Sequence, residues 1–167
     1  MKLYILRHGI AVERGDASYA KDSDRPLTPK GERKLWKIAK AIEALGLKFD
    51  LILSSPYTRA RQTAEIVAEA LNARKKLEFT DNLTPAGSFK KLVDFIKDLS
   101  SSPKSILLVG HEPYLSQFIS LLVGGDQGLS IALKKGGLCK LSSQSLKAGH
   151  WATLDWLMTP KQMALME

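Results

Sequence analysis

Short apolar runs alternate with longer amphipathic segments through about residue 125 of the chain. The runs at 2–6, 49–53, 76–80 and 105–109 have the length and composition of buried strands. Each is followed by a segment with apolar residues at intervals of three and four, the period of a helix with one buried face, and these segments lie around 29–45, 60–71, 89–99 and 115–122. Thr28-Pro29 and Gly46 are typical of the beginning and the end of the first helix.

The last part of the chain has a different pattern, in which apolar and polar residues alternate between residues 130 and 156. A period of two predicts two or three antiparallel strands at a sheet edge, with Gly136-Gly137 as the turn between them. Strands that alternate with helices predict a parallel sheet covered on both faces. We therefore expect one α/β domain over residues 1–167, a three-layer α/β/α sandwich whose mostly parallel central sheet has an antiparallel edge.

Charged and polar side chains gather where three of the predicted strands end. Arg7-His8-Gly9 follows the first strand, the segment 54–59 follows the second, and Gly110-His111-Glu112 follows the fourth. Sites in such sheets form beyond the carboxyl ends of the strands. The three segments are therefore predicted to meet at one edge of the sheet.

The residue types in these segments suit phosphoryl transfer. A phosphoryl group in transfer spreads negative charge over three oxygens, so its site needs fixed cations and a nucleophile in line with the leaving group. Arg7 can fork onto two oxygens, Arg59 adds a cation near a helix N-terminus, and His111 can donate to a third oxygen. His8 is then the candidate nucleophile, provided that it is neutral and its other ring nitrogen donates to a backbone carbonyl.

Neighbouring residues also allow purely structural interpretations. Arg25 is equally compatible with a substrate-binding role at the rim of the pocket and with an ion pair to Asp22 or Asp24. Glu112 suits the beginning of a helix without any function. Cys139 lies in an alternating stretch and is interpreted as a small core residue.

Composition narrows the function further. Three histidines and a single cysteine leave no cluster with the spacing of a metal site, so no metal or other cofactor is expected. The apolar runs are too short to cross a bilayer and the start of the chain carries no secretory signal, which predicts a cytoplasmic protein without a membrane partner. The net charge of +8 favours anionic partners. Because aromatic and basic stacking motifs are lacking, no nucleic-acid partner is expected.

Four motifs follow one another along the chain. They are Leu6-Arg7-His8-Gly9, residues 25–31 (RPLTPKG), residues 54–64 (SSPYTRARQTA) and residues 109–113 (VGHEP). In this order they resemble the histidine phosphatase superfamily, whose fold is phosphoglycerate mutase-like, and the short length with the complete 25–31 string is similar to its SixA-type phosphohistidine phosphatases. The resemblance implies that His8 is the phosphorylated nucleophile and that Arg7, Arg59 and His111 form the phosphate pocket.

One departure from the larger family bears on the substrate. Mutases and phosphoester phosphatases of the superfamily usually carry a glutamate after the third strand as general acid, whereas residues 80–87 read TDNLTPAG. Imidazole has a pKa of about 6.5 and needs a donated proton far less than an alkoxide does when it leaves. The sequence therefore favours a phosphatase that hydrolyses phosphohistidine through a covalent phosphohistidine intermediate, with histidine phosphotransfer domains of histidine-aspartate relays as candidate substrates.

Two other functions stay open. A small-molecule phosphomonoesterase acting on a phosphorylated metabolite would need an acid from Asp81 or another carboxylate. A non-catalytic module that binds phosphate or nucleic acid would use the net positive charge alone, but it would not require a histidine nucleophile.

Overall fold

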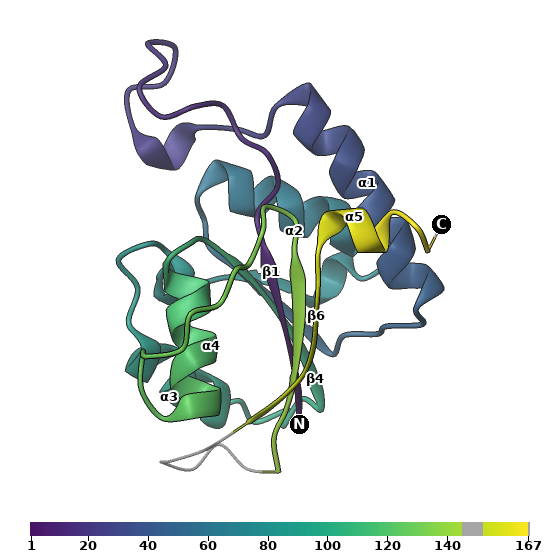
Figure 1. Cartoon of the computed structure of the whole chain (residues 1–167), viewed down its shortest axis with the longest axis vertical. Helices are drawn as coiled ribbons and strands as arrows, with labels where there is room; N and C mark the ends of the chain where they lie inside the picture. Colours follow the sequence, from purple (N-terminus) through teal and green to yellow (C-terminus); the bar gives the residue numbers. More distant parts are fainter. Residues whose placement is uncertain (145–151, 167) are drawn as a thin grey trace.

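A computed structural model describes residues 1–144 and 152–166, whose strands form one six-stranded sheet (Figure 1). The strands are β1 (Lys2–Arg7), β2 (Leu51–Ser54), β3 (Leu77–Phe79), β4 (Ser105–Gly110), β5 (Leu138–Ser142) and β6 (Thr153–Met158). Their order in the sheet is β3-β2-β4-β1-β5-β6. The strands β3, β2, β4 and β1 are parallel to one another, whereas β5 is antiparallel to β1 and β6 is antiparallel to β5. The predicted mixed sheet with an antiparallel edge is thus confirmed.

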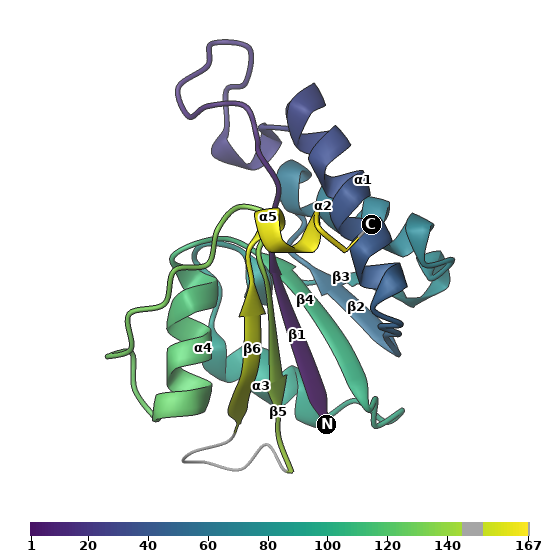
Figure 2. The same ribbon diagram turned by 45° about the vertical axis from the view of Figure 1, so that its right-hand side comes forward.

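Helices cover both faces of this sheet (Figure 2). The α-helices are α1 (Pro29–Ala44), α2 (Thr58–Ala70), α3 (Phe89–Lys97), α4 (Tyr114–Gly124) and α5 (Pro160–Met163), and the short 3-10 helices are η1 (Asp22–Asp24), η2 (Arg74–Lys76) and η3 (Asp81–Leu83). One face packs against α1, α2 and α5, and the other packs against α3 and α4. No helix within the described part of the chain is both long and apolar enough to span a membrane.

Alternation along each strand divides the core into two halves. On β1, Tyr4 and Leu6 belong to the half beneath α1 and α2, whereas Leu3 and Ile5 belong to the half beneath α3 and α4. Successive side chains of a strand point to opposite faces, so a run that is apolar throughout becomes buried on both sides. This is why the continuous apolar runs of the sequence mark the central strands.

The beginning of α1 lies against the chain that leaves β1. Thr28 Oγ1 accepts a hydrogen bond from Gly31 N at 3.0 Å, which caps the helix as its sequence predicts. Thr28 N donates to Ile10 O at 2.9 Å. A Cβ on Gly31 would lie 2.0 Å from the same carbonyl oxygen, so only glycine permits this approach. The segment immediately after His8 is therefore pressed against the helix.

The predicted position of the Gly136-Gly137 turn is wrong. The two glycines precede β5, and the connection from β5 to β6 is a later segment of which residues 145–151 lie outside the described part. Gly136 adopts a φ of 77°, and its N lies 3.0 Å from Arg7 O and 3.1 Å from His8 O. The glycine pair marks a turn, as the sequence suggested. However, this turn does not connect two strands of a hairpin. It brings the chain before β5 close to the end of β1.

Candidate active site

The three polar segments predicted to meet lie together at the carboxyl edge of the sheet. The register of β1 and β4 places Arg7 opposite Gly110, and His8 N donates to Gly110 O at 3.1 Å. The ring centroids of His8 and His111 are 5.1 Å apart. Arg59, in the first turn of α2, reaches the same point with its Nε 3.2 Å from His8 Nε2. Residues far apart in sequence thus form one cluster.

His8 is a buried imidazole with a defined tautomer. Its Nδ1 lies 2.7 Å from Gly9 O, and because a carbonyl only accepts, Nδ1 carries the ring proton. The pKa of His8 is lowered to about 3, mainly by burial and also by the charges of Arg59, Arg7 and Lys135, against the raising effect of the Gly9 hydrogen bond. The ring is therefore neutral near pH 7, and Nε2 presents a lone pair.

His111 is also buried and neutral. Its Nε2 lies 2.8 Å from Ser55 Oγ, which also accepts a hydrogen bond from Tyr57 N. The Ser55 hydroxyl has one proton to donate, and we assign it to His111 Nε2. Under that assignment His111 Nδ1 is a donor, and this atom is buried without a partner. Burial lowers the pKa of His111 to about 2, with His8 and Arg59 as further causes. The ring can offer one hydrogen bond to a group placed beside it.

Arg7 supplies a second donor of this kind. Its NH1 donates to Leu133 O at 2.9 Å, which fixes the guanidinium, while its Nε is buried without a partner. Among the residues that the structure describes, only three buried side-chain polar atoms lack a partner, and two of them are Arg7 Nε and His111 Nδ1. Orphaned buried donors are costly, and two in one pocket fit an anion that binds both.

A pocket of about 570 Å³ opens onto these groups. It is lined by Arg7, His8, Ala11, Val12, Glu13, Arg14, Arg25, Arg59, Pro85, His111, Glu112, Pro113 and Lys135. The loop between β1 and α1 rises from this edge of the sheet and carries part of the lining (Figure 1). Cations outnumber carboxylates in the lining, so the pocket favours an anionic ligand.

Asp22 is the residue that sequence reasoning missed as an organiser of the site. Arg59 NH1 donates to Asp22 O at 2.7 Å, and Arg59 NH2 lies 3.0 Å from Asp22 Oδ2. Although burial alone would raise the pKa of Asp22, hydrogen bonds and charges from Arg25 and Arg59 lower it to about 2. The carboxylate is therefore ionised and orients a guanidinium that is only 3% exposed. The only indication in the sequence was that Asp22 lies three residues before Arg25.

The structure shows the ion pair expected of Arg25, and a substrate-binding role for it stays a prediction. Its Nε and NH2 lie 3.0 and 2.7 Å from Asp22 Oδ1, and its NH1 donates to Val12 O. Arg25 also lines the pocket. The guanidinium thus fastens the loop between β1 and α1 at the rim, and it adds positive charge there.

Three further residues considered in the sequence analysis are Glu112, Asp81 and Cys139. Glu112 Oε1 accepts from Ser116 N at 2.9 Å, the capping role expected of it, although the side chain also lines the pocket. Asp81 is exposed on η3 and is absent from the lining, which argues against it as the replacement acid. Cys139 is buried, and burial raises the pKa of its thiol to about 12, consistent with a core residue.

Two residues inside the 54–64 string gain a role that the pattern alone did not give them. Ser55 orients His111, as described above. Thr63 Oγ1 accepts from Gly9 N at 3.1 Å and donates to Arg59 O at 2.7 Å. It thereby links the chain after His8 to the first turn of α2.

Within the described residues no group of three or more His, Cys, Asp or Glu could hold a metal ion, and His150 lies outside them.

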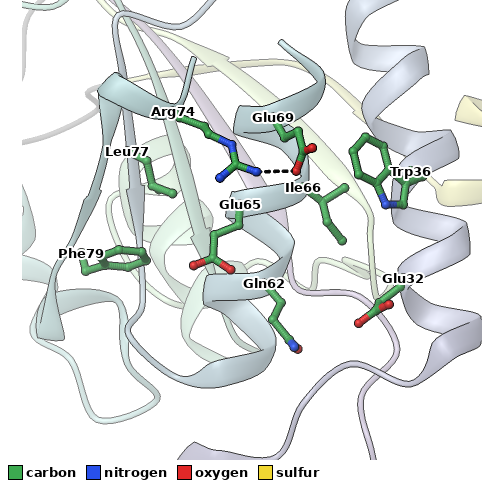
Figure 3. Close-up of a pocket in the computed structure, with 9 residues that line it drawn as sticks. All are labelled: Glu32, Trp36, Gln62, Glu65, Ile66, Glu69, Arg74, Leu77 and Phe79. Carbon is green, nitrogen blue, oxygen red and sulfur yellow. Dashed lines mark hydrogen bonds and ion pairs between the residues drawn. The ribbon is translucent and has the colours of Figure 1, made fainter. Parts of the chain in front are cut away.

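A second groove, of about 620 Å³, lies between α1, α2 and β3 (Figure 3). It is lined by Glu32, Trp36, Gln62, Glu65, Ile66, Glu69, Arg74, Leu77 and Phe79. Its one cation, Arg74, is paired with Glu69 at 2.6 Å. The remaining glutamates give this groove a negative charge, which disfavours a phosphorylated ligand. Of these two pockets, the histidine pocket is therefore the one whose charge suits a phosphorylated ligand.

Sequence comparisons with known proteins find the same family that the four motifs resemble. The model of the histidine phosphatase superfamily (branch 1) matches residues 3–84. An uncharacterised protein of Picosynechococcus sp. is 42% identical over 144 residues, 86% of each chain. The phosphohistidine phosphatase SixA homolog of Haemophilus influenzae is 30% identical over 138 residues, which covers 78% of this chain and 82% of the relative.

Solved structures show the same fold. The protein histidine phosphatase SixA complexed with tungstate is 26% identical, covers 96% of this chain and 98% of its own, and superposes with a TM-score of 0.82. A phosphoglycerate mutase from Bacillus anthracis is 15% identical, with a TM-score of 0.75 over 99% of this chain and 96% of its own. The phosphoglycerate mutase-like fold expected from the sequence is thereby confirmed.

The low pKa of His8 predicts how stability depends on pH. Between about pH 6.5, its ordinary pKa, and about pH 3, its folded value, the unfolded chain binds a proton that the folded chain does not. The free energy of unfolding should therefore fall as the pH is lowered through this range, by up to about 1.4 kcal/mol per pH unit for one proton. Urea titrations of the wild type and His8→Asn between pH 4 and 7.5 measure this pH dependence of the free energy of unfolding. The variant should show a slope shallower by about one proton; equal slopes would contradict the assignment.

Proposed function

The chain belongs to the histidine phosphatase superfamily and is a phosphatase, and we propose that it removes phosphoryl groups from phosphohistidine side chains of proteins. The observation that carries this proposal is a neutral buried imidazole beside two unpaired donors, Arg7 Nε and His111 Nδ1. In this proposal His8 is the nucleophile, and Arg7, Arg59 and His111 hold the phosphoryl group. Arg25 contributes charge at the rim.

The first step transfers the phosphoryl group to the enzyme. His8 Nε2 uses its lone pair to form a bond to phosphorus, and the bond from phosphorus to the substrate imidazole nitrogen breaks. The electron pair of that bond stays on the substrate ring, which is protonated at its other nitrogen and therefore leaves as neutral imidazole. Arg59 Nε, which donates to His8 Nε2 in the present structure, turns its hydrogen bond to a phosphoryl oxygen when the group arrives.

The second step regenerates the enzyme. Water attacks phosphorus from the side opposite His8, and the bond from phosphorus to His8 Nε2 breaks with its electron pair returning to the ring. The proton of the attacking water leaves to solvent or to the phosphate that forms. The hydrogen bond from His8 Nδ1 to Gly9 O holds the ring in one orientation through both steps.

The choice of phosphohistidine rests on the leaving group. Of the described carboxylates, Glu13 and Glu112 line the pocket, and Glu112 is engaged at the beginning of α4. A basic alkoxide would need a well-placed acid, whereas imidazole leaves without one. SixA relatives, named as phosphohistidine phosphatases, support the same choice, and a histidine phosphotransfer domain is the partner we propose. The alternative, a phosphomonoesterase for small metabolites, would have to use Glu13 as its acid, because Asp81 lies outside the pocket and Glu112 is engaged.

Substrates that differ in leaving group test the proposal. A phosphohistidine-loaded histidine phosphotransfer domain, a phosphoserine peptide and p-nitrophenyl phosphate are compared by kcat/KM, with His8→Ala as the inactive control and excess chelator in a parallel series. We expect phosphohistidine to exceed phosphoserine by at least about 100-fold, the usual contribution of a general acid. Chelator should leave the rates unchanged. Hydrolysis of phosphoserine as fast as phosphohistidine would contradict the proposal and favour the phosphomonoesterase.

Asp22 provides a test of how Arg59 is positioned. Asp22→Asn keeps the size of the side chain but removes the charge that orients the guanidinium, and we expect kcat/KM to fall about tenfold because the phosphoryl contact is misplaced. Asp24→Asn is the matched control, since Asp24 lies on the same 3-10 helix and is exposed. The melting temperature of each variant is measured alongside. Full activity in Asp22→Asn would contradict a role for Asp22 in positioning Arg59.

A further inference from the structure

The turn before β5 is held against the end of β1. Gly136 N lies within hydrogen-bond distance of both Arg7 O and His8 O, and Leu133 O accepts from the Arg7 side chain. These contacts flank Lys135 on both sides. Its backbone is therefore fixed beside the nucleophile, although its side chain is exposed.

Lys135 differs from the other pocket cations in its bonding. Arg14, Arg25 and Arg59 all contact the carboxylate of Asp22. Lys135 lines the same pocket, and among the described residues no acceptor or carboxylate is paired with it. An ammonium with no partner among those residues can form its hydrogen bonds with an anion in the pocket.

The charge of Lys135 acts on the proposed nucleophile. Burial is the main cause that lowers the pKa of His8, and Lys135 is one of three cations that add to it. The other two, Arg59 and Arg7, are the residues proposed to hold the phosphoryl group. Lys135 lines the pocket, and its charge acts on the His8 ring in the same direction as those two arginines.

We propose that the Lys135 ammonium binds the oxygens of the phosphoryl group that enters the pocket, together with Arg7 Nε and His111 Nδ1. The proposal rests on the proposed function of this pocket. A lysine is a compact charge on a flexible stem, so it can follow the phosphoryl group as it arrives and release it as inorganic phosphate. Lys135 would then be a catalytic residue contributed by the turn before β5, outside the four sequence motifs.

Binding of inorganic phosphate tests this directly. The dissociation constant is measured by calorimetry for the wild type, Lys135→Ala, Lys135→Arg and Lys134→Ala. Lys134 is the matched control because it is the exposed neighbour and is absent from the pocket lining. Both alanine variants remove one positive charge, so a difference between them reports a local contact rather than the field of the whole protein.

We expect Lys135→Ala to weaken phosphate binding about tenfold, the effect of losing one charge-assisted hydrogen bond at a partly exposed site. Lys135→Arg should recover most of the affinity, and Lys134→Ala should stay within about twofold of the wild type. Equal effects of the two alanine variants, or no measurable binding to the wild type, would overturn the proposal. Because the probe is phosphate itself, failure of the phosphohistidine assignment would leave this result interpretable.

Discussion

The parallel pairing of β1 with β4 is the constraint on which the site depends. Its register places Arg7 opposite Gly110, so the residues that follow, His8 and His111, emerge side by side from the same edge of the sheet. A slip of one residue would exchange the two faces of a strand that is buried on both sides, and the core would not tolerate it. The apolar packing of Leu3, Ile5 and their neighbours therefore also specifies the distance between the two imidazoles.

Burial and positive charge act in the same direction on these imidazoles. Each disfavours the imidazolium form, so the two rings stay neutral in a pocket whose arginines stay charged. In the proposed mechanism, a neutral imidazole then attacks phosphorus while the charged arginines stabilise negative charge. Asp22 contributes by gathering Arg25 and Arg59 around one carboxylate, which preorganises the pocket before any substrate arrives. Part of the positive charge behind the net value of +8 therefore lines the anion pocket. The groove beside Trp36 and Phe79 has the opposite character and is acidic.

Local patterns were sufficient to predict most of the elements and the convergence of the site. The apolar runs located the central strands, and Thr28 capped its helix as expected. What could not be predicted are contacts between distant segments that leave no local signature. Two adjacent glycines indicate a turn equally well in a hairpin or against another strand, so the place of Gly136 beside His8 depends on the assembled sheet. Asp22 was seen only as a neighbour of Arg25, because its contact with Arg59 spans 37 residues of sequence.

The identity of the phosphorylated atom tests the account most directly. Enzyme quenched during turnover is digested, the phosphorylated peptide is located by mass spectrometry, and phosphorus NMR assigns the ring nitrogen. The account predicts an acid-labile, alkali-stable phosphoryl group on His8 at Nε2, because Nδ1 is committed to Gly9 O. A phosphoryl group on Nδ1, on another residue, or in an acid-stable linkage would contradict it.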